Sequence, residues 1–69
     1  MKVSARNLLS GKVKSITKGL VNCEVVVEVA PGVEVVSVIT LTSVENLGLK
    51  PGSDVKAMVK ASSVMLTVD

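Results

Sequence analysis

Valine is the residue that most constrains how this chain can fold. Sixteen of its 69 residues are Val, and Val, Ile and Leu together make 25. A β-branched side chain loses rotamer freedom in a helix but packs well on a pleated sheet. Turn-forming Gly and Pro residues divide the valine-rich stretches into short runs. The sequence therefore predicts an all-β fold, and its length allows a single domain, which we place at residues 1–69.

The positions of the apolar runs and of the turns between them predict five strands. These strands span about residues 8–17, 21–29, 34–41, 54–61 and 64–68. Gly11 is expected to bend or bulge the first strand, because a glycine inside a strand often marks such a place. Lys18-Gly19 and Ala30-Pro31-Gly32 have the composition of the turns that follow the first two strands.

One short helix is expected between the third and fourth strands. Thr42 and Glu45 have the spacing of a capping box, which makes Thr42 the predicted N-cap. Gly48 is the kind of residue that commonly ends a helix. Five short strands with one helix in this place fit a small Greek-key barrel of the OB type.

The faces of the predicted strands suggest that the chain assembles with copies of itself. Residues 23, 25, 27 and 29 form one apolar face of the second strand. In the third strand, however, Val36 and Val38 lie on the face opposite Val35 and Ile39, whereas a strand with one solvated face should alternate cleanly. A chain this short also has a thin core, for which oligomerisation is a common remedy. We therefore expect a homo-oligomer, although scattered exposed valines would also explain the pattern.

The residue types that the chain lacks exclude several kinds of function. It has no Phe, Trp, Tyr or His, and Cys23 is its single cysteine. Without aromatic rings a single-stranded nucleic acid finds no stacking surface, and a net charge of +2 is mild for such a partner. Without His there is no neutral-pH acid–base group, and one cysteine builds neither a disulfide nor a zinc site. We therefore expect a protein that is not an enzyme, with no catalytic cofactor, no metal cation site and no nucleic-acid partner.

The sequence also lacks the features of a membrane or secreted protein. Residues 1–9 show no signal-peptide apolar region, and no stretch approaches the length of a membrane span. With one cysteine, the cytoplasm is the expected compartment. We expect no membrane partner.

Two short clusters are rich in hydrogen-bond donors. Ser4-Ala5-Arg6-Asn7 supplies a hydroxyl, a guanidinium and an amide, and Lys60-Ala61-Ser62-Ser63 supplies an ammonium, two hydroxyls and turn N–H groups. Convergent donors and cations are what an oxyanion needs. A weaker third cluster spans residues 17–22. Each cluster also has a plainer explanation, because Ser and Asn often form turns and caps, and because Arg6 and Lys60 would ordinarily be solvated surface charges.

Taken in chain order, these segments carry a resemblance to a known family. The segments are Ser4-Ala5-Arg6-Asn7, Gly11-Lys12-Val13, Asn46-Leu47-Gly48-Leu49-Lys50-Pro51-Gly52 and Lys60-Ala61-Ser62-Ser63-Val64-Met65-Leu66. From about Lys2 to Leu66 the chain resembles the Mop family, the molbindins, which are single OB-type domains that bind molybdate or tungstate. The resemblance implies that fold, those oxyanion ligands and an intracellular role in molybdenum storage or homeostasis.

The resemblance also implies an assembly and the place of its sites. Family members are hexamers, built as trimers of dimers, that hold oxyanions at subunit interfaces. One site would be lined by residues of two subunits: Ser4, Ala5, Arg6 and Asn7 of one, and Lys60, Ala61 and Ser62 of another. A second oxyanion site, nearer the threefold axis, would involve Gly19, Val21 and Asn22. Two other functions stay open on the residues alone, an OB-type nucleic-acid-binding domain and a structural or regulatory interaction module without a ligand.

Overall fold

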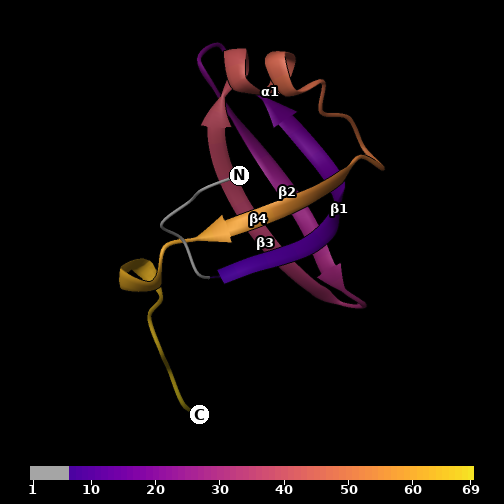
Figure 1. Ribbon diagram of the computed structural model, residues 1–69. Coiled ribbons are helices and arrows are strands. Elements are labelled where there is room, and N and C mark those ends of the chain that lie inside the picture. Colours follow the sequence, from indigo (N-terminus) through magenta and orange to yellow (C-terminus); the bar gives the residue numbers. More distant parts are fainter. Residues whose placement is uncertain (1–6) are drawn as a thin grey trace.

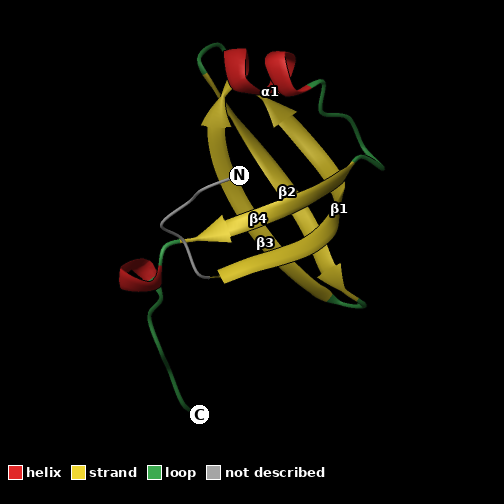
Figure 2. Ribbon diagram, in the orientation of Figure 1, coloured by secondary structure: helices red, strands yellow, loops and turns green. Residues whose placement is uncertain are grey.

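Four antiparallel strands form one curled sheet in the computed structural model, which describes residues 7–69 (Figures 1 and 2). The strands are β1 (Asn7–Lys18), β2 (Asn22–Ala30), β3 (Val33–Thr40) and β4 (Asp54–Val59). Their order across the sheet is β3-β2-β1-β4, so three hairpin-connected strands are followed by a fourth that returns beside the first. That order is a Greek key. The prediction of an all-β class is confirmed.

The fifth predicted strand is not confirmed. After β4 the chain forms a single 3₁₀ turn, η1 (Ala61–Ser63), and residues 64–69 have no regular structure. This tail runs away from the sheet (Figure 1), and Met65, Leu66 and Val68 are each more than nine-tenths exposed. A strand needs a neighbouring backbone to pair with, and the tail pairs with no strand of the described residues. The fourth strand is correspondingly shorter than expected, since it ends at Val59 and not at Ala61.

The irregular point of β1 is not at Gly11, where a bulge was one of the two expectations. The register shift against β2 falls between Val13 and Ser15, which leaves Lys14 as the extra residue. Gly11 lies where β1 changes its pairing from β4 to β2, and a Cβ atom there would lie 2.5 Å from the carbonyl oxygen of Glu28. The glycine is therefore required by the close approach of the β2 backbone. The bulge at Lys14, further along β1, adds local twist to the strand.

Helix α1 (Leu41–Leu47) lies between β3 and β4 as expected, but its N-cap is Thr40 and not Thr42. The hydroxyl oxygen of Thr40 accepts a hydrogen bond of 3.0 Å from the Ser43 backbone N–H. The helix starts this early because β3 runs directly into it, and the Leu41 N–H is held by the Val21 carbonyl at 2.8 Å. Gly48 ends the helix with a φ of 64°, which confirms its predicted role.

The core is small and consists of short side chains. Val13, Cys23, Val25, Val27 and, from α1, Val44 are its buried members. The predicted inner face of β2 is therefore confirmed, and α1 covers one end of the curled sheet with Val44 (Figure 1). On the outer face of β3, by contrast, Val36 is 59% exposed and Val38 is 67% exposed. Nothing in residues 7–69 covers that second apolar face.

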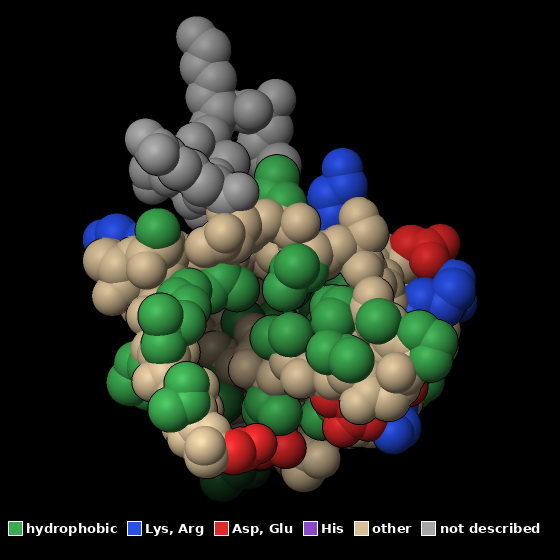
Figure 3. Space-filling model, turned by 90° about the horizontal axis from the view of Figure 1, so that it is seen from below, with side chains coloured by type: hydrophobic (Ala, Val, Ile, Leu, Met, Phe, Trp, Pro, Cys, Tyr) green, Lys and Arg blue, Asp and Glu red, His purple; other side chains and the backbone are tan. Residues whose placement is uncertain are grey.

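The curled sheet stays open between its two edge strands. A cavity of about 380 Å³ lies there, lined among others by Val35 and Ile39 of β3 and by Val55 and Val59 of β4. Seen from the end opposite α1, hydrophobic side chains gather around a hollow (Figure 3). Residues 7–69 contain no helix that is long and apolar enough to cross a membrane.

Candidate functional site

The sheet register brings Asn7, the last residue of the first predicted donor cluster, beside the residue that precedes the second cluster. Asn7 is the first residue of β1 and Val59 the last of β4, and the two are direct partners in the antiparallel ladder. Asn7 and the turn that follows Val59 therefore lie at the same end of the β1–β4 pair. Ser4, Ala5 and Arg6 are outside the described residues, whereas Asn7, Lys60, Ala61 and Ser62 are described and exposed.

A side-chain hydrogen bond reinforces this junction. The amide Nδ2 of Asn7 donates to the carbonyl oxygen of Val59 at 3.2 Å. Asn7 is one of the donors predicted from the sequence, whereas Val59 is not among the predicted site residues. Only the strand register could have pointed to Val59, because its contribution is a backbone carbonyl.

The Lys60 cluster forms a tight turn, and its first N–H groups have no backbone partner among the described residues. Lys60 precedes η1, and its carbonyl accepts from the Ser63 N–H at 2.8 Å, while the Ala61 carbonyl accepts from the Val64 N–H at 3.3 Å. The N–H groups of Ala61 and Ser62 donate to no backbone carbonyl of residues 7–69. Exposed amides beside a lysine ammonium and a serine hydroxyl form a donor set suited to an anion.

The third predicted cluster, in residues 17–22, lies at the opposite end of β1. Gly19, Leu20 and Val21 connect β1 to β2, and the Gly19 N–H donates to the Asn22 carbonyl at 2.9 Å. A Cβ at Gly19 would lie 2.6 Å from that same oxygen, so the tight connection requires glycine. Val21 is 70% exposed, and Asn22 opens β2. Within one chain this cluster is therefore separate from Asn7 and the Lys60 turn.

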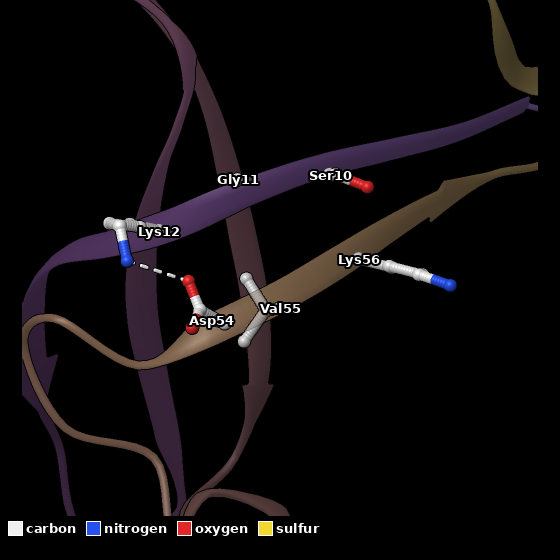
Figure 4. Close-up of a pocket in the computed structure, with 6 residues that line it drawn as sticks. All are labelled: Ser10, Gly11, Lys12, Asp54, Val55 and Lys56. Atoms are coloured by element: carbon white, nitrogen blue, oxygen red, sulfur yellow. Dashed lines mark hydrogen bonds and ion pairs between the residues drawn. The ribbon is translucent and has the colours of Figure 1, made fainter.

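A further surface pocket was not anticipated from the sequence. It is lined by Ser10, Gly11, Lys12, Asp54, Val55 and Lys56 (Figure 4). Lys12 Nζ and Asp54 Oδ1 form an ion pair of 2.7 Å there, while Lys56 points away from it (Figure 4). The Asp54 carboxylate offsets the Lys12 charge and would repel an oxyanion, so we do not assign this pocket to the site.

The remaining chemistry of residues 7–69 is sparse. They contain no group of three or more His, Cys, Asp or Glu side chains placed to hold a metal ion. Cys23 is a buried free thiol within the core. The polar features that stand out are therefore hydrogen-bond donors at strand ends.

These features are those of a small OB-type domain with a polar donor cluster at one end of its sheet. A family model described as the TOBE domain matches residues 3–66. The chain belongs to the TOBE domain family, and its likeness to the Mop proteins within it is confirmed by the relatives that follow.

Three relatives cover nearly the whole chain. The molybdenum-pterin-binding protein 3 of Clostridium pasteurianum is 50% identical over 66 residues, which are 96% of this chain and 97% of the relative. A molybdate-binding protein of Sporomusa ovata has a solved structure with a TM-score of 0.91 and 43% identity, covering 99% of this chain and 100% of the other. ModG, a cytoplasmic molybdate-binding protein solved with molybdate bound, has a TM-score of 0.94 and 46% identity, and this chain spans 49% of its length.

Proposed function

We propose that this chain binds molybdate, and tungstate as a close analogue, at the end of the β1–β4 pair. The observation that supports the proposal is the pairing of Asn7, from the first donor cluster, with Val59, the residue directly before the Lys60 turn. The site residues are Ser4, Ala5, Arg6, Asn7, Lys60, Ala61 and Ser62. The names of the relatives, a molybdenum-pterin-binding protein and two molybdate-binding proteins, support the choice of anion.

The donor set matches the chemistry of the ligand. Molybdate is a tetrahedral dianion that accepts hydrogen bonds at every oxygen and needs no covalent ligand. Charge-assisted hydrogen bonds are about twice as strong as neutral ones, so the Lys60 ammonium and the Arg6 guanidinium would contribute most. Free amides and hydroxyls of the turn would complete the shell and orient the anion.

We place the site at an interface within a homohexamer built as a trimer of dimers, where the clusters of different subunits meet. The register partners Leu8 and Met58 follow directly on the Asn7–Val59 pair and are 45% and 52% exposed. The uncovered outer face of β3 and the apolar tail residues add to the surface that a second copy would bury. A weaker second oxyanion site at Gly19, Val21 and Asn22 belongs to the same proposal.

The role that fits this binding is storage or homeostasis of molybdenum in the cytoplasm, without catalysis. ModG, the relative already described as cytoplasmic, supports the compartment. A binding protein of this kind needs only reversible occupancy, and ligand bound at an interface also stabilises the assembly. Ligand at a hundred times its dissociation constant would add about 2.7 kcal/mol.

Titration calorimetry with molybdate, tungstate and sulfate tests the proposal. We expect saturable binding of molybdate and tungstate at micromolar free anion, and weaker binding of sulfate at the same ionic strength. Native mass spectrometry with and without molybdate should show a hexamer. A protein that shows no saturable uptake of either metal oxyanion would rule the function out.

A further inference from the structure

The Asn7 side chain makes a hydrogen bond within the protein that a direct anion ligand does not require. Its amide nitrogen donates to the Val59 carbonyl, 3.2 Å away, on the strand partner that lies directly opposite. Val59 is the last residue of β4, and the next residue, Lys60, begins the turn that carries the proposed ligands. The hydrogen bond therefore spans the point at which the regular ladder ends and the turn begins.

Strand ends fray unless something other than the ladder holds them. Beyond Val59 the described backbone makes no further ladder contact with β1, and among residues 7–69 the backbone hydrogen bonds that close the turn come from Ser63 and Val64. Lys60, Ala61 and Ser62 are all exposed, so packing does not fix them. The Asn7 amide joins β1 to Val59, the last residue before this turn.

We propose that Asn7 is a positioning residue, which orders the Lys60–Ser63 turn for oxyanion binding through the Val59 carbonyl. This inference rests on the proposed function and deepens it, because it assigns Asn7 a role distinct from that of the anion's direct donors. Because the Asn7 amide donates a hydrogen bond to the Val59 carbonyl, the turn that follows Val59 is already ordered before the anion binds. Preorganisation of this kind raises affinity by lowering the ordering cost of binding.

Four variants of the full chain test the role. Asn7→Leu keeps the size and removes the donor, Asn7→Asp keeps the shape and replaces the donor with a carboxylate, and Asn7→Gln keeps an amide on a longer arm. Asn46→Leu, at an exposed position of α1 away from the site, is the matched control. Two quantities are measured, the molybdate affinity by calorimetry and the amide exchange of Ser63 by NMR in the anion-free protein.

We expect Asn7→Leu to weaken molybdate binding about three- to tenfold, the effect of one net hydrogen bond. We expect the same variant to speed Ser63 exchange before any anion is added, and Asn7→Gln to restore part of both properties. Asn7→Asp should be at least as impaired as Asn7→Leu, and Asn46→Leu should match the wild type.

Two results would overturn the positioning role. In the first, Ser63 exchange in anion-free Asn7→Leu equals that of the wild type while affinity falls, which would make Asn7 a direct ligand only. In the second, affinity is unchanged in Asn7→Leu. Failure of the wild-type chain to bind molybdate would instead sink the proposed function, and the exchange measurement would still decide whether Asn7 orders the turn.

Discussion

Lys14 of β1 and Glu34 of β3 form an ion pair that reaches across the strand between them, β2. Glu34 is the direct cross-strand partner of Glu28, and like charges in that position repel each other. The bulge that leaves Lys14 unpaired in the ladder brings its ammonium to this acidic pair. The hydrogen bond and the charge of Glu34, with a smaller contribution from Glu28, raise the pKa of Lys14 above its ordinary value of 10.5, against partial desolvation.

This ion pair predicts a dependence of stability on alkaline pH. A raised pKa in the folded state means that the pair contributes fully below pH 10.5 and loses its contribution as the pH rises through the higher folded-state pKa. Lys14→Met should therefore be less stable than the wild type at neutral pH, by a small amount because the pair is exposed, and the difference should vanish at strongly alkaline pH. Urea denaturation from pH 7 upward measures it.

An exposed lysine without such a partner provides the control for Lys14. Lys56 forms no ion pair within residues 7–69, so Lys56→Met should show the same small offset from the wild type at every pH. A Lys14→Met curve that runs parallel to that of Lys56→Met throughout would show that the pair with Glu34 has no effect in solution.

The N-cap of α1 gives a second prediction about stability. Thr40→Ala removes the hydroxyl that accepts from the Ser43 N–H and should lower the free energy of unfolding by about 1 kcal/mol. Thr40→Ser keeps the acceptor and should lose less. Thr42→Ala, at the exposed position that the sequence pattern favours as the cap, should be nearly neutral. Chemical denaturation measures the free energy of unfolding of the three variants. A larger loss for Thr42→Ala than for Thr40→Ala would mean that Thr42 is the N-cap, as the capping-box pattern predicts.

Local sequence patterns predicted most helices and strands correctly. They failed where contacts between distant parts of the chain determine the bounds of an element or whether a strand has a partner. The alternation of apolar residues in β2 was sufficient to predict that Cys23, Val25 and Val27 are buried. The N-cap was misplaced because the pattern could not show that the Val21 carbonyl holds the Leu41 amide at the start of the helix. The fifth strand was predicted from its apolar run and the turn before it, but a strand also needs a neighbour, and residues 64–68 pair with no strand of residues 7–69.

The candidate site divides in the same way. The donor types of Lys60, Ala61 and Ser62 are visible in the sequence, as is the amide of Asn7. That Asn7 and Val59 lie opposite each other depends on the pairing of β1 with β4 across 52 residues of chain, which no local pattern contains. The bulge at Lys14 was likewise invisible, since the residue that suggested it, Gly11, serves a close contact with β2 instead.

The charge of Lys60 should matter more for anion binding than that of any other lysine on β4 or beside it. A hydrogen bond to a charged group is worth about 1.5–3 kcal/mol, so Lys60→Ala should weaken molybdate binding by about ten- to a hundredfold. Lys56→Ala removes the same charge at an exposed position of β4, the strand that leads to Lys60, and it should have little effect because we leave Lys56 out of the site. Calorimetry at one fixed ionic strength compares the molybdate affinities of the two variants. Equal losses of affinity would mean that Lys60 acts only through its contribution to the net charge and is not a ligand.

The two faces of the sheet should respond differently to a new carboxylate. Val27 is 5% exposed within the core, so Val27→Asp would bury an unpaired charge. The cost of burying that charge exceeds what a marginally stable small domain can tolerate, and the variant should not fold.

Val36 is 59% exposed on the outer face of β3, so Val36→Asp should leave the subunit folded. If that outer face is covered in the hexamer, Val36→Asp should also lower the native mass. Circular dichroism and native mass spectrometry measure the two effects. A folded Val27→Asp chain would mean that the core is assigned to the wrong face, and a hexameric Val36→Asp chain would mean that the outer face of β3 lies outside the interface.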